Sequence, residues 1–156
     1  MLVGVISDTH GLLRPEAIDA LRGSELIVHA GDVGDAHVLE HLHAIAPTVA
    51  VRGNIDTGQW ARALSPTEVV DVEDLQLYVL HDLTTLDLDA KAAGFSAVIS
   101  GHTHRASAQT RDGVLYLNPG SAGPRRFTLP LSLARLRVEG SHLSYEVVEL
   151  PGPASG

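Results

Sequence analysis

Five loops of this sequence begin with side chains of the kinds that bind metal ions, and each loop follows a short apolar run. These side chains are Asp8, His10, Asp32, Asn54, His81, His102 and His104. Imidazole, carboxylate and amide ligands without sulfur suit manganese, iron, zinc, nickel or cobalt. Seven ligands are too many for one tetrahedral zinc ion, but they suit two ions about 3.5–4 Å apart that share a carboxylate. The sequence therefore predicts a site for two divalent cations.

Two pairs of these residues have the same spacing. Asp8 and His10 are two residues apart, and so are His102 and His104. On extended backbone, side chains at i and i+2 point to the same side, so we expect each pair to reach into one site. Glycine permits turns and close approaches that other residues do not. It stands beside the ligands at Gly11, Gly31, Gly53 and Gly101.

The elements that must position these loops can be predicted from the apolar pattern. Strands are predicted at 2–6, 25–29, 48–51, 67–72, 75–80, 97–100, 107–111, 114–117, 131–138 and 142–150. Helices are predicted at 15–22, 36–46 and 88–93. Alternating strands and helices favour parallel pairing in the first half, and hairpin signals favour antiparallel pairing in the second. Because ligands gather at the carboxyl ends of parallel strands, we expect the five loops to converge.

Composition limits the class of protein. The chain has 156 residues, which fits one domain at 1–150 followed by a flexible tail at 151–156. It contains no cysteine, no apolar run of the roughly 20 residues that span a bilayer, and no signal-peptide pattern, so we expect a cytoplasmic protein without a membrane partner. The net charge of −8 argues against nonspecific binding to nucleic acids.

The order of the five motifs resembles the calcineurin-like metallophosphoesterases. The motifs are Asp8-Thr9-His10, Gly31-Asp32, Gly53-Asn54, His81 and Gly101-His102-Thr103-His104. A further stretch, Asn118-Pro119-Gly120-Ser121 followed by Pro124-Arg125, is similar to the compact YfcE-like phosphodiesterases. The resemblance implies an α/β (α+β) fold, a four-layer αββα sandwich in which two mixed β-sheets are flanked by helices.

The same resemblance implies how the ligands are shared. Asp8, His10, Asp32 and His104 would hold one metal ion, and Asp32, Asn54, His81 and His102 the other. Asp32, Asn54 and His102 would serve catalysis through the ions and a bridging hydroxide, which would attack phosphorus. Manganese is the favoured metal, with nickel, iron, zinc and cobalt as alternatives, and assembly into a homo-oligomer is left open.

Two positions depart from the family pattern. Many members have a histidine directly after Gly-Asn that protonates the leaving group, and here that position is Ile55, which cannot donate a proton. Asp82 stands where glycine commonly follows the fourth-motif histidine, so it either orients a ligand or brings negative charge near the second ion.

Other polar residues near the motifs leave two interpretations open. Asp56 either orients a histidine or forms a turn, and Arg125 and Arg126 either contact phosphate or pair with surface acids. Asn118 and its turn are expected to shape the backbone near the site. His29 is predicted to be a core histidine with its hydrogen bonds satisfied.

The resemblance implies a metal-dependent phosphodiesterase that acts on a small phosphate ester, because the short chain leaves little length for a substrate lid. A phosphomonoesterase is the alternative among enzymes. A metal-binding scaffold without catalysis is the alternative of another class, since a eukaryotic retromer subunit of this fold acts in that way and a fold does not determine a function.

Overall fold

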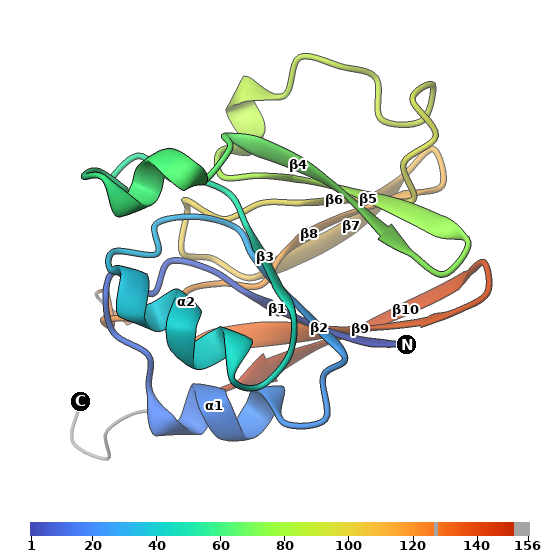
Figure 1. Cartoon of the computed structure of the whole chain (residues 1–156). Coiled ribbons are helices and arrows are strands. Elements are labelled where there is room, and N and C mark those ends of the chain that lie inside the picture. Colours follow the sequence, from blue (N-terminus) through green and yellow to red (C-terminus); the bar gives the residue numbers. More distant parts are fainter. Residues whose placement is uncertain (127, 152–156) are drawn as a thin grey trace.

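The protein consists of two five-stranded sheets packed face to face, as the computed structural model shows for residues 1–126 and 128–151 (Figure 1). The first sheet has the order β10-β9-β1-β2-β3, and the second has the order β4-β5-β6-β8-β7. The strands of the first sheet are β1 (Leu2–Ile6), β2 (Leu26–His29), β3 (Thr48–Ala50), β9 (Ser132–Glu139) and β10 (His142–Glu149). Those of the second are β4 (Thr67–Val72), β5 (Leu75–Leu80), β6 (Ala97–Ile99), β7 (Ser107–Arg111) and β8 (Val114–Asn118).

Both sheets mix parallel and antiparallel pairs. Strands β1, β2 and β3 are parallel, as predicted for the first half of the chain, and β9 pairs antiparallel with β1. The predicted antiparallel pairing of the second half is confirmed for the hairpins β4–β5, β7–β8 and β9–β10, but it was wrong for β6, which pairs parallel with both β5 and β8. The connections into β6 and β8 are long enough to be crossovers, which parallel pairing requires.

The core between the sheets is aliphatic, in keeping with an aromatic content of 4%. Val5 and Leu136 of the first sheet belong to the same buried cluster as Leu77, Ile99 and Leu117 of the second. Their removal from water is the main favourable contribution to packing the sheets together.

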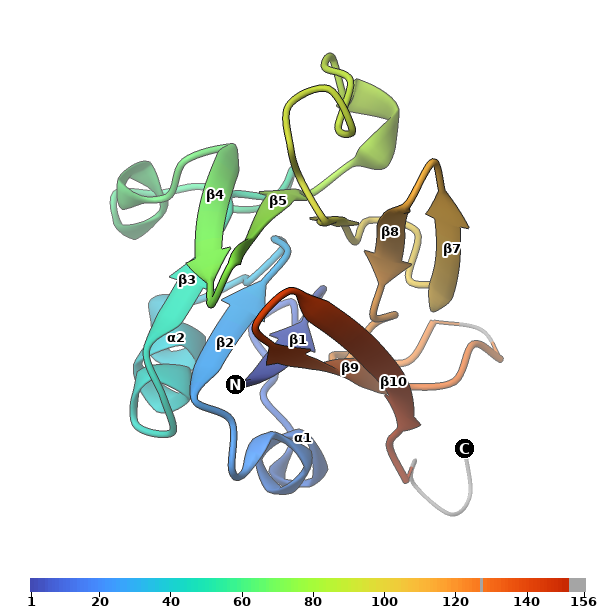
Figure 2. The same cartoon turned by 90° about the vertical axis from the view of Figure 1, so that its right-hand side faces the viewer.

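Two helices cover the outer face of the first sheet (Figure 2). Helix α1 (Pro15–Leu21) starts with proline, whose fixed φ suits the first turn. Helix α2 (Ala36–His43) is capped by the carboxylate of Asp35, which accepts from the backbone N–H of His37. Buried Leu21 and Leu42 of these helices pack in one cluster with Ile27 and Leu133 of the sheet.

The outer layer on the second sheet is much thinner, and the predicted helix at 88–93 was wrong. Residues 90–94 form a turn, in which Ala93 N–H donates to the carbonyl of Asp89. A six-residue helix is too short to be stable without strong packing. The cover consists of this loop and the short 3₁₀ helix η2 (Leu83–Thr85), while another 3₁₀ helix, η1 (Trp60–Ala63), precedes β4.

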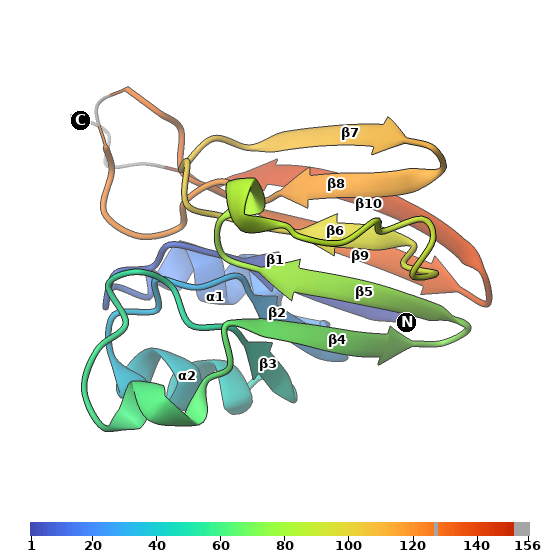
Figure 3. The ribbon, with the colours of Figure 1, turned by 90° about the horizontal axis from the view of Figure 1, so that it is seen from above.

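The carboxyl ends of β1, β2, β3, β5 and β6 meet at one end of the sandwich, on the left in Figure 3. Each of these strands leads directly into one of the five predicted ligand loops. The α/β sandwich with two mixed sheets is therefore confirmed, with a reduced fourth layer.

The predicted tail lies mostly outside the described residues, which end at the exposed Pro151. Among the residues that are described, no helix has both the length and the apolar character needed to cross a lipid bilayer.

Candidate metal centre

Six of the seven predicted ligands lie in two groups at the shared end of the sheets. The first group is Asp8, His10 and His104, and the second is Asp32, His81 and His102. Within each group, one potential ligand atom per residue lies within 4.8 Å of the others. The seventh residue, Asn54, lies beside the second group, with its Oδ1 atom 3.0 Å from Nε2 of His81.

The first group is built around the fully buried carboxylate of Asp8. Its Oδ2 atom accepts from the hydroxyl of Ser7 at 2.7 Å and from the backbone N–H of His102 at 3.1 Å. Its Oδ1 atom instead faces the imidazoles, 3.4 Å from Nε2 of His104 and 3.8 Å from Nε2 of His10. One oxygen is therefore held by the scaffold, and the other is left for the group.

Three buried polar atoms of this first group have no hydrogen-bond partner among the described residues. They are Oδ1 of Asp8, Nε2 of His10 and Nδ1 of His104. An unsatisfied buried polar atom costs about 1–3 kcal/mol, and such atoms are rare. Oδ1 of Asp8 and Nε2 of His10 are 3.8 Å apart, and Nε2 of His104 is 3.4 Å from the same oxygen. A carboxylate beside two imidazoles suits a divalent cation, which would satisfy the first two of these atoms together.

The second group is more open, because 44% of the His102 side chain is exposed. Nδ1 of His81 is 2.8 Å from the carbonyl of Ala30, which requires the proton on Nδ1 and leaves Nε2 to face the group. That Nε2 atom is 3.3 Å from Nδ1 of His102 and 3.0 Å from the Asn54 oxygen. Anchoring one ring nitrogen on a backbone carbonyl is the usual arrangement of a metal-binding histidine.

The electrostatics of the second group favour positive charge. Burial opposes a charge on His81, but its hydrogen bonds to Asp32 and Ala30 and the charges of Asp32 and Asp8 outweigh that effect and raise its pKa. A cation at the same place would be stabilised by the same carboxylates and would displace the proton.

Asp32 lies between the two groups. Its Oδ1 atom accepts from the backbone N–H of Ile55 at 3.0 Å, while its Oδ2 atom is 3.2 Å from Nε2 of His81 and 3.6 Å from Nε2 of His10. Burial raises the pKa of this carboxyl group, but hydrogen bonds from His81 and Ile55 and the nearby imidazole charges lower it overall. The geometry suits a carboxylate shared by two cations.

Five of the seven predicted ligands have backbone in the left-handed region, which non-glycine residues rarely adopt. Their φ angles are 56° at Asp8, 48° at His10, 56° at Asp32, 75° at His102 and 64° at His104. The prediction that extended backbone aligns each pair was therefore wrong. Asp8 and His10 converge through a left-handed turn, and His102 and His104 diverge into different groups.

Two glycines are required by close approach of the loops. A Cβ atom at Gly101 would overlap the hydroxyl of Ser7 and lie 2.6 Å from Oδ2 of Asp8. A Cβ atom at Gly53 would overlap the backbone nitrogen and the Oδ1 atom of Asp32. Neither loop could approach its carboxylate if a side chain stood at these positions.

Asp56 ends a turn, as one of its two interpretations predicted, because its N–H donates to the carbonyl of Gly53 at 3.2 Å. It is buried, and its carboxylate accepts from the backbone N–H groups of Val33 at 3.2 Å, Gly34 at 2.9 Å and Gly53 at 2.8 Å. It therefore ties the second loop to the third through backbone, and no hydrogen bond joins it to a histidine among the described residues.

Asp82 and the two arginines lie at the rim. Asp82 accepts from the backbone N–H and hydroxyl of Thr84, which lowers its pKa, and its Oδ2 atom is 3.8 Å from Nε2 of His102. Arg125 and Arg126 line a cavity of about 140 Å³ together with His10 and His104. Burial lowers the pKa of His104, Asp8 opposes this, and the positive charge of Arg126 adds to it.

His29 is a core histidine with both ring nitrogens hydrogen-bonded, as predicted, and it also connects the first two loops, which sequence reasoning missed. It is fully buried, and Nδ1 accepts from Gly31 N–H at 3.1 Å. Nε2 must then carry the proton, and it donates at 3.0 Å to the hydroxyl of Thr9, which donates to the carbonyl of Val33. Burial lowers the pKa of His29 to about 3, so the ring is neutral. One sign of this role in the sequence is that His29 stands two residues before Gly31 of the second ligand loop.

The predicted turn at Asn118 lies against the ligand loops, as expected. Nδ2 of Asn118 donates to the carbonyl of Gly101 at 2.9 Å and to the hydroxyl of Thr103 at 3.2 Å. Ser121 donates to the backbone carbonyl of Asp8 at 3.0 Å. This turn therefore supports the loops that carry Asp8 and His102.

Comparison with known proteins agrees with the family resemblance of the sequence motifs. Residues 1–141 match the family model for the calcineurin-like phosphoesterase superfamily domain. A protein named probable metallophosphoesterase from Methanothermobacter thermautotrophicus is 34% identical over 165 residues, which cover 98% of this chain and 95% of that protein.

Two solved structures show the same fold. An archaeal phosphodiesterase is 26% identical, with a TM-score of 0.78 and coverage of 95% of this chain and all of that one. Vps29 of Chaetomium thermophilum is 22% identical, with a TM-score of 0.84 and coverage of 99% of this chain and 91% of that one.

Proposed function

We propose that this chain, which belongs to the calcineurin-like phosphoesterase superfamily, is a metal-dependent phosphodiesterase that hydrolyses a small phosphate ester. The family match and the phosphodiesterase relative support phosphoester hydrolysis in general. The observation that carries the more specific proposal is the carboxylate of Asp32, which lies between two groups of side chains suited to divalent cations.

Each of two cations would have four protein ligands. One set is Asp8, His10, Asp32 and His104, and the other is Asp32, Asn54, His81 and His102. When bound, such a pair of ions lowers the pKa of coordinated water, which becomes the nucleophile, and neutralises charge on the phosphate group. Manganese is the metal we favour, and nickel, iron, zinc and cobalt are also compatible with these ligands.

The protein's own contribution is to hold the ligands in place before substrate arrives. The Ile55 N–H fixes one oxygen of Asp32, so the other stays directed at both groups. Asn54 adds an oxygen without a negative charge, which limits repulsion of an anionic phosphate. The exposed His102 lies on the open side, where a substrate can enter.

Ile55 limits the choice of leaving group. Its side chain is 40% exposed beside Asn54, at the place where a histidine would supply a proton. A hydrocarbon side chain cannot do so, and therefore the leaving group must be stable as an anion or take its proton from solvent. We accordingly propose esters with acidic alcohols as the best substrates.

Arg125 and Arg126 provide positive charge beside the first group, whereas Asp82 lies beside His102 of the second group. Both arginines border the cavity next to His10 and His104. Arginine binds phosphate oxygens with two parallel hydrogen bonds. We propose that these side chains contact the phosphate group and offset the negative net charge of the protein near the site.

The test is hydrolysis of bis-p-nitrophenyl phosphate with Mn²⁺ or Ni²⁺, compared with the monoester p-nitrophenyl phosphate. We expect the diester to be hydrolysed faster, and Asp8→Asn to remove the activity because it removes a ligand charge. A strong preference for the monoester would instead indicate a phosphomonoesterase.

The similarity in fold to Vps29 favours one alternative of a different class, a scaffold without catalysis. Inactivity toward both esters while two ions are bound would support that alternative. Metal content measured on the same sample distinguishes an inactive scaffold from an enzyme that lacks its ions.

A further inference from the structure

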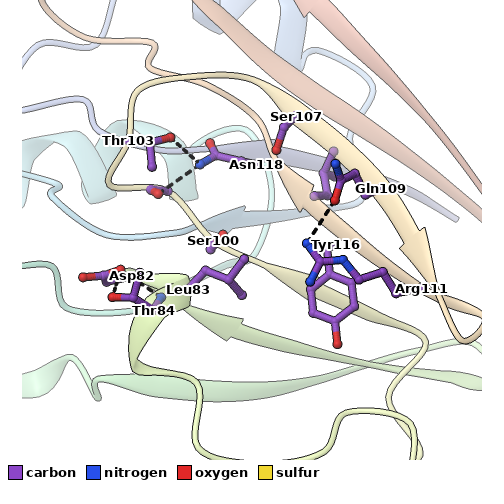
Figure 4. Close-up of a pocket in the computed structure, with 12 residues that line it drawn as sticks. Asp82, Leu83, Thr84, Ser100, Thr103, Ser107, Gln109, Arg111, Tyr116 and Asn118 are labelled. Atoms are coloured by element: carbon purple, nitrogen blue, oxygen red, sulfur yellow. Dashed lines mark hydrogen bonds between the residues drawn. The ribbon is translucent and has the colours of Figure 1, made fainter.

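A hollow of about 280 Å³ lies next to the candidate metal centre, on the outer face of the second sheet (Figure 4). Three segments form its walls, and each contributes residues that Figure 4 labels. They are Asp82, Leu83 and Thr84 before and within η2, then Ser100, Gly101 and Thr103 after β6, and the outward-facing residues of β7 and β8.

The hollow exists because the outer layer on this sheet is incomplete. The loop at 86–96 and η2 pack over β5 and β6, where Leu86, Leu88 and Phe95 contact the cluster that contains Tyr78 and Val98. Strands β7 and β8 extend beyond this cover (Figure 2). The outer face of these two strands therefore borders open space.

The hollow lies beside the candidate metal centre. Gly101 and Thr103 line it and are the chain neighbours of His102. Asp82 lines it as well, and its carboxylate is 3.8 Å from His102. Asp82 also borders a second cavity, which is lined by Asn54, His81 and His102, so the two spaces share the Asp82 side chain.

The far wall combines an aromatic ring with a guanidinium group. Arg111 lies over Tyr116, with its Cζ atom 5.2 Å from the ring centroid, and its Nη2 atom donates to Oε1 of Gln109 at 3.0 Å. This bond holds the planar guanidinium in place. Ser107 and Gln109 alternate with Arg111 along β7 and present polar groups on the same face of the sheet.

These side chains suit a flat heteroaromatic ring. Bases stack on aromatic rings and on arginine guanidinium planes, and their polar edges form hydrogen bonds with side chains such as serine and glutamine. Asn118, two residues after Tyr116 on β8, donates from its side chain to the carbonyl of Gly101, the residue before His102. Two residues span at most about 7 Å, a separation short enough for one nucleoside-sized group to bridge.

We propose that this hollow binds a nucleoside, or a similar flat aromatic group, that forms the alcohol retained on the phosphate when the diester is hydrolysed. The proposal rests on the phosphodiesterase function proposed above and adds a substrate class to it. A phosphomonoester contains only one alcohol, which departs, so this hollow would give a diester an advantage.

The experiment compares two diesters that share the p-nitrophenolate leaving group. One carries thymidine as its other alcohol, and the second carries methanol. We expect the wild-type protein with Mn²⁺ to prefer the thymidine ester by about tenfold in kcat/KM, the effect of stacking one base. Tyr116→Ala should remove most of this preference by raising the KM for the thymidine ester. It should leave the rate with the methyl ester unchanged.

Two further variants act as controls. Tyr116→Phe retains the ring and should retain the preference. Tyr145→Ala removes another exposed tyrosine, on β10 of the other sheet, and should change neither ester. Similar melting temperatures would show that the variants are folded.

The outcomes test nucleoside binding in the hollow separately from the phosphodiesterase function. If Tyr116→Ala and the wild type show the same preference between the two esters, the assignment of the hollow is wrong and the phosphodiesterase function stands. If the wild type hydrolyses neither ester, the proposed function is wrong, and binding of thymidine monophosphate measured by calorimetry tests the hollow alone. About tenfold weaker binding to Tyr116→Ala would then support it, and equal binding would overturn it.

Discussion

The two groups of candidate ligands differ in how far the protein satisfies them by itself. In the first group, Asp8 and His104 are buried, and three polar atoms of Asp8, His10 and His104 have no partner among the described residues. In the second group, His81 contacts Asp32, Asn54 and His102.

This difference predicts unequal metal affinity. A cation in the first group would satisfy buried atoms that otherwise have a cost in folding free energy. In the second group it would have to replace existing contacts and bind beside a more exposed side chain. We therefore expect the first group to bind its ion more tightly.

The largest effect is expected when the carboxylate common to both groups is removed. Asp32→Ala should abolish binding of at least one ion and weaken the other, with a loss of kcat/KM beyond the roughly 10–100-fold typical of a residue that only supports a ligand. Metal content and kinetics on the same sample measure this. Asp71→Ala, at an exposed aspartate of β4, is the matched control. An equal or larger loss in Asn54→Ala would contradict a shared role for Asp32.

The next largest effect tests the difference between the groups directly. Asp8→Asn keeps the shape of the side chain but removes its charge, and it should weaken the tighter of two binding steps by more than about 100-fold, the upper end for a residue that only supports a ligand. His102→Ala should weaken only the other step, by at least about tenfold. Calorimetric titration with Mn²⁺ resolves the two steps. If His102→Ala affects the tighter step and Asp8→Asn the weaker one, the second group binds its ion more tightly than the first, contrary to our expectation.

A smaller effect concerns stability and pH. The pKa of His29 is about 3 in the folded protein and 6.5 in an ordinary setting, so the unfolded chain takes up a proton first as pH falls. The stabilisation from a neutral His29 is complete above pH 6.5 and decreases below it, by about 1.4 kcal/mol per pH unit.

His29→Gln keeps a donor and an acceptor but does not titrate. Its free energy of unfolding should therefore fall less steeply than that of the wild type between pH 6 and pH 4, as measured by urea denaturation of metal-free protein. Parallel curves for the two proteins would show that His29 does not account for the slope.

The smallest effect is expected at Asp82. Its side chain is about a third exposed, and its carboxylate is 3.8 Å from His102, so the interaction is screened by solvent. Asp82→Asn should change the affinity of the second group by less than about threefold. A tenfold change in either direction, measured by the same titration, would mean that Asp82 controls the second group directly.

Much of the site could be predicted from the sequence because each candidate ligand directly follows a strand. Asp8 lies two residues after the end of β1, Asp32 three after β2 and His81 one after β5. Their residue types alone indicate metal binding. The geometry could not be predicted in the same way. The left-handed backbone at Asp8 and His10 depends on contacts with other loops, which local sequence does not report.

The missed features depend on tertiary contacts. Asp56 reaches three backbone N–H groups on two loops, and the hydrogen bonds of His29 join residues 20 positions apart. The parallel pairing of β6 with β8 depends on a crossover rather than on the hairpin signals nearby. The predicted helix at 88–93 is reduced to a turn, because the side chain of Asp89 accepts from the backbone N–H of Ala92 at its start and Gly94, with a φ of 86°, ends it.

The central claim is that two cations bind on either side of Asp32. Its most direct test is anomalous diffraction from crystals grown with Mn²⁺. We expect two anomalous peaks, one among Asp8, His10 and His104 and one among Asn54, His81 and His102, each in contact with Asp32. An absence of peaks at these groups in protein shown to be folded, or peaks only elsewhere, would contradict the account.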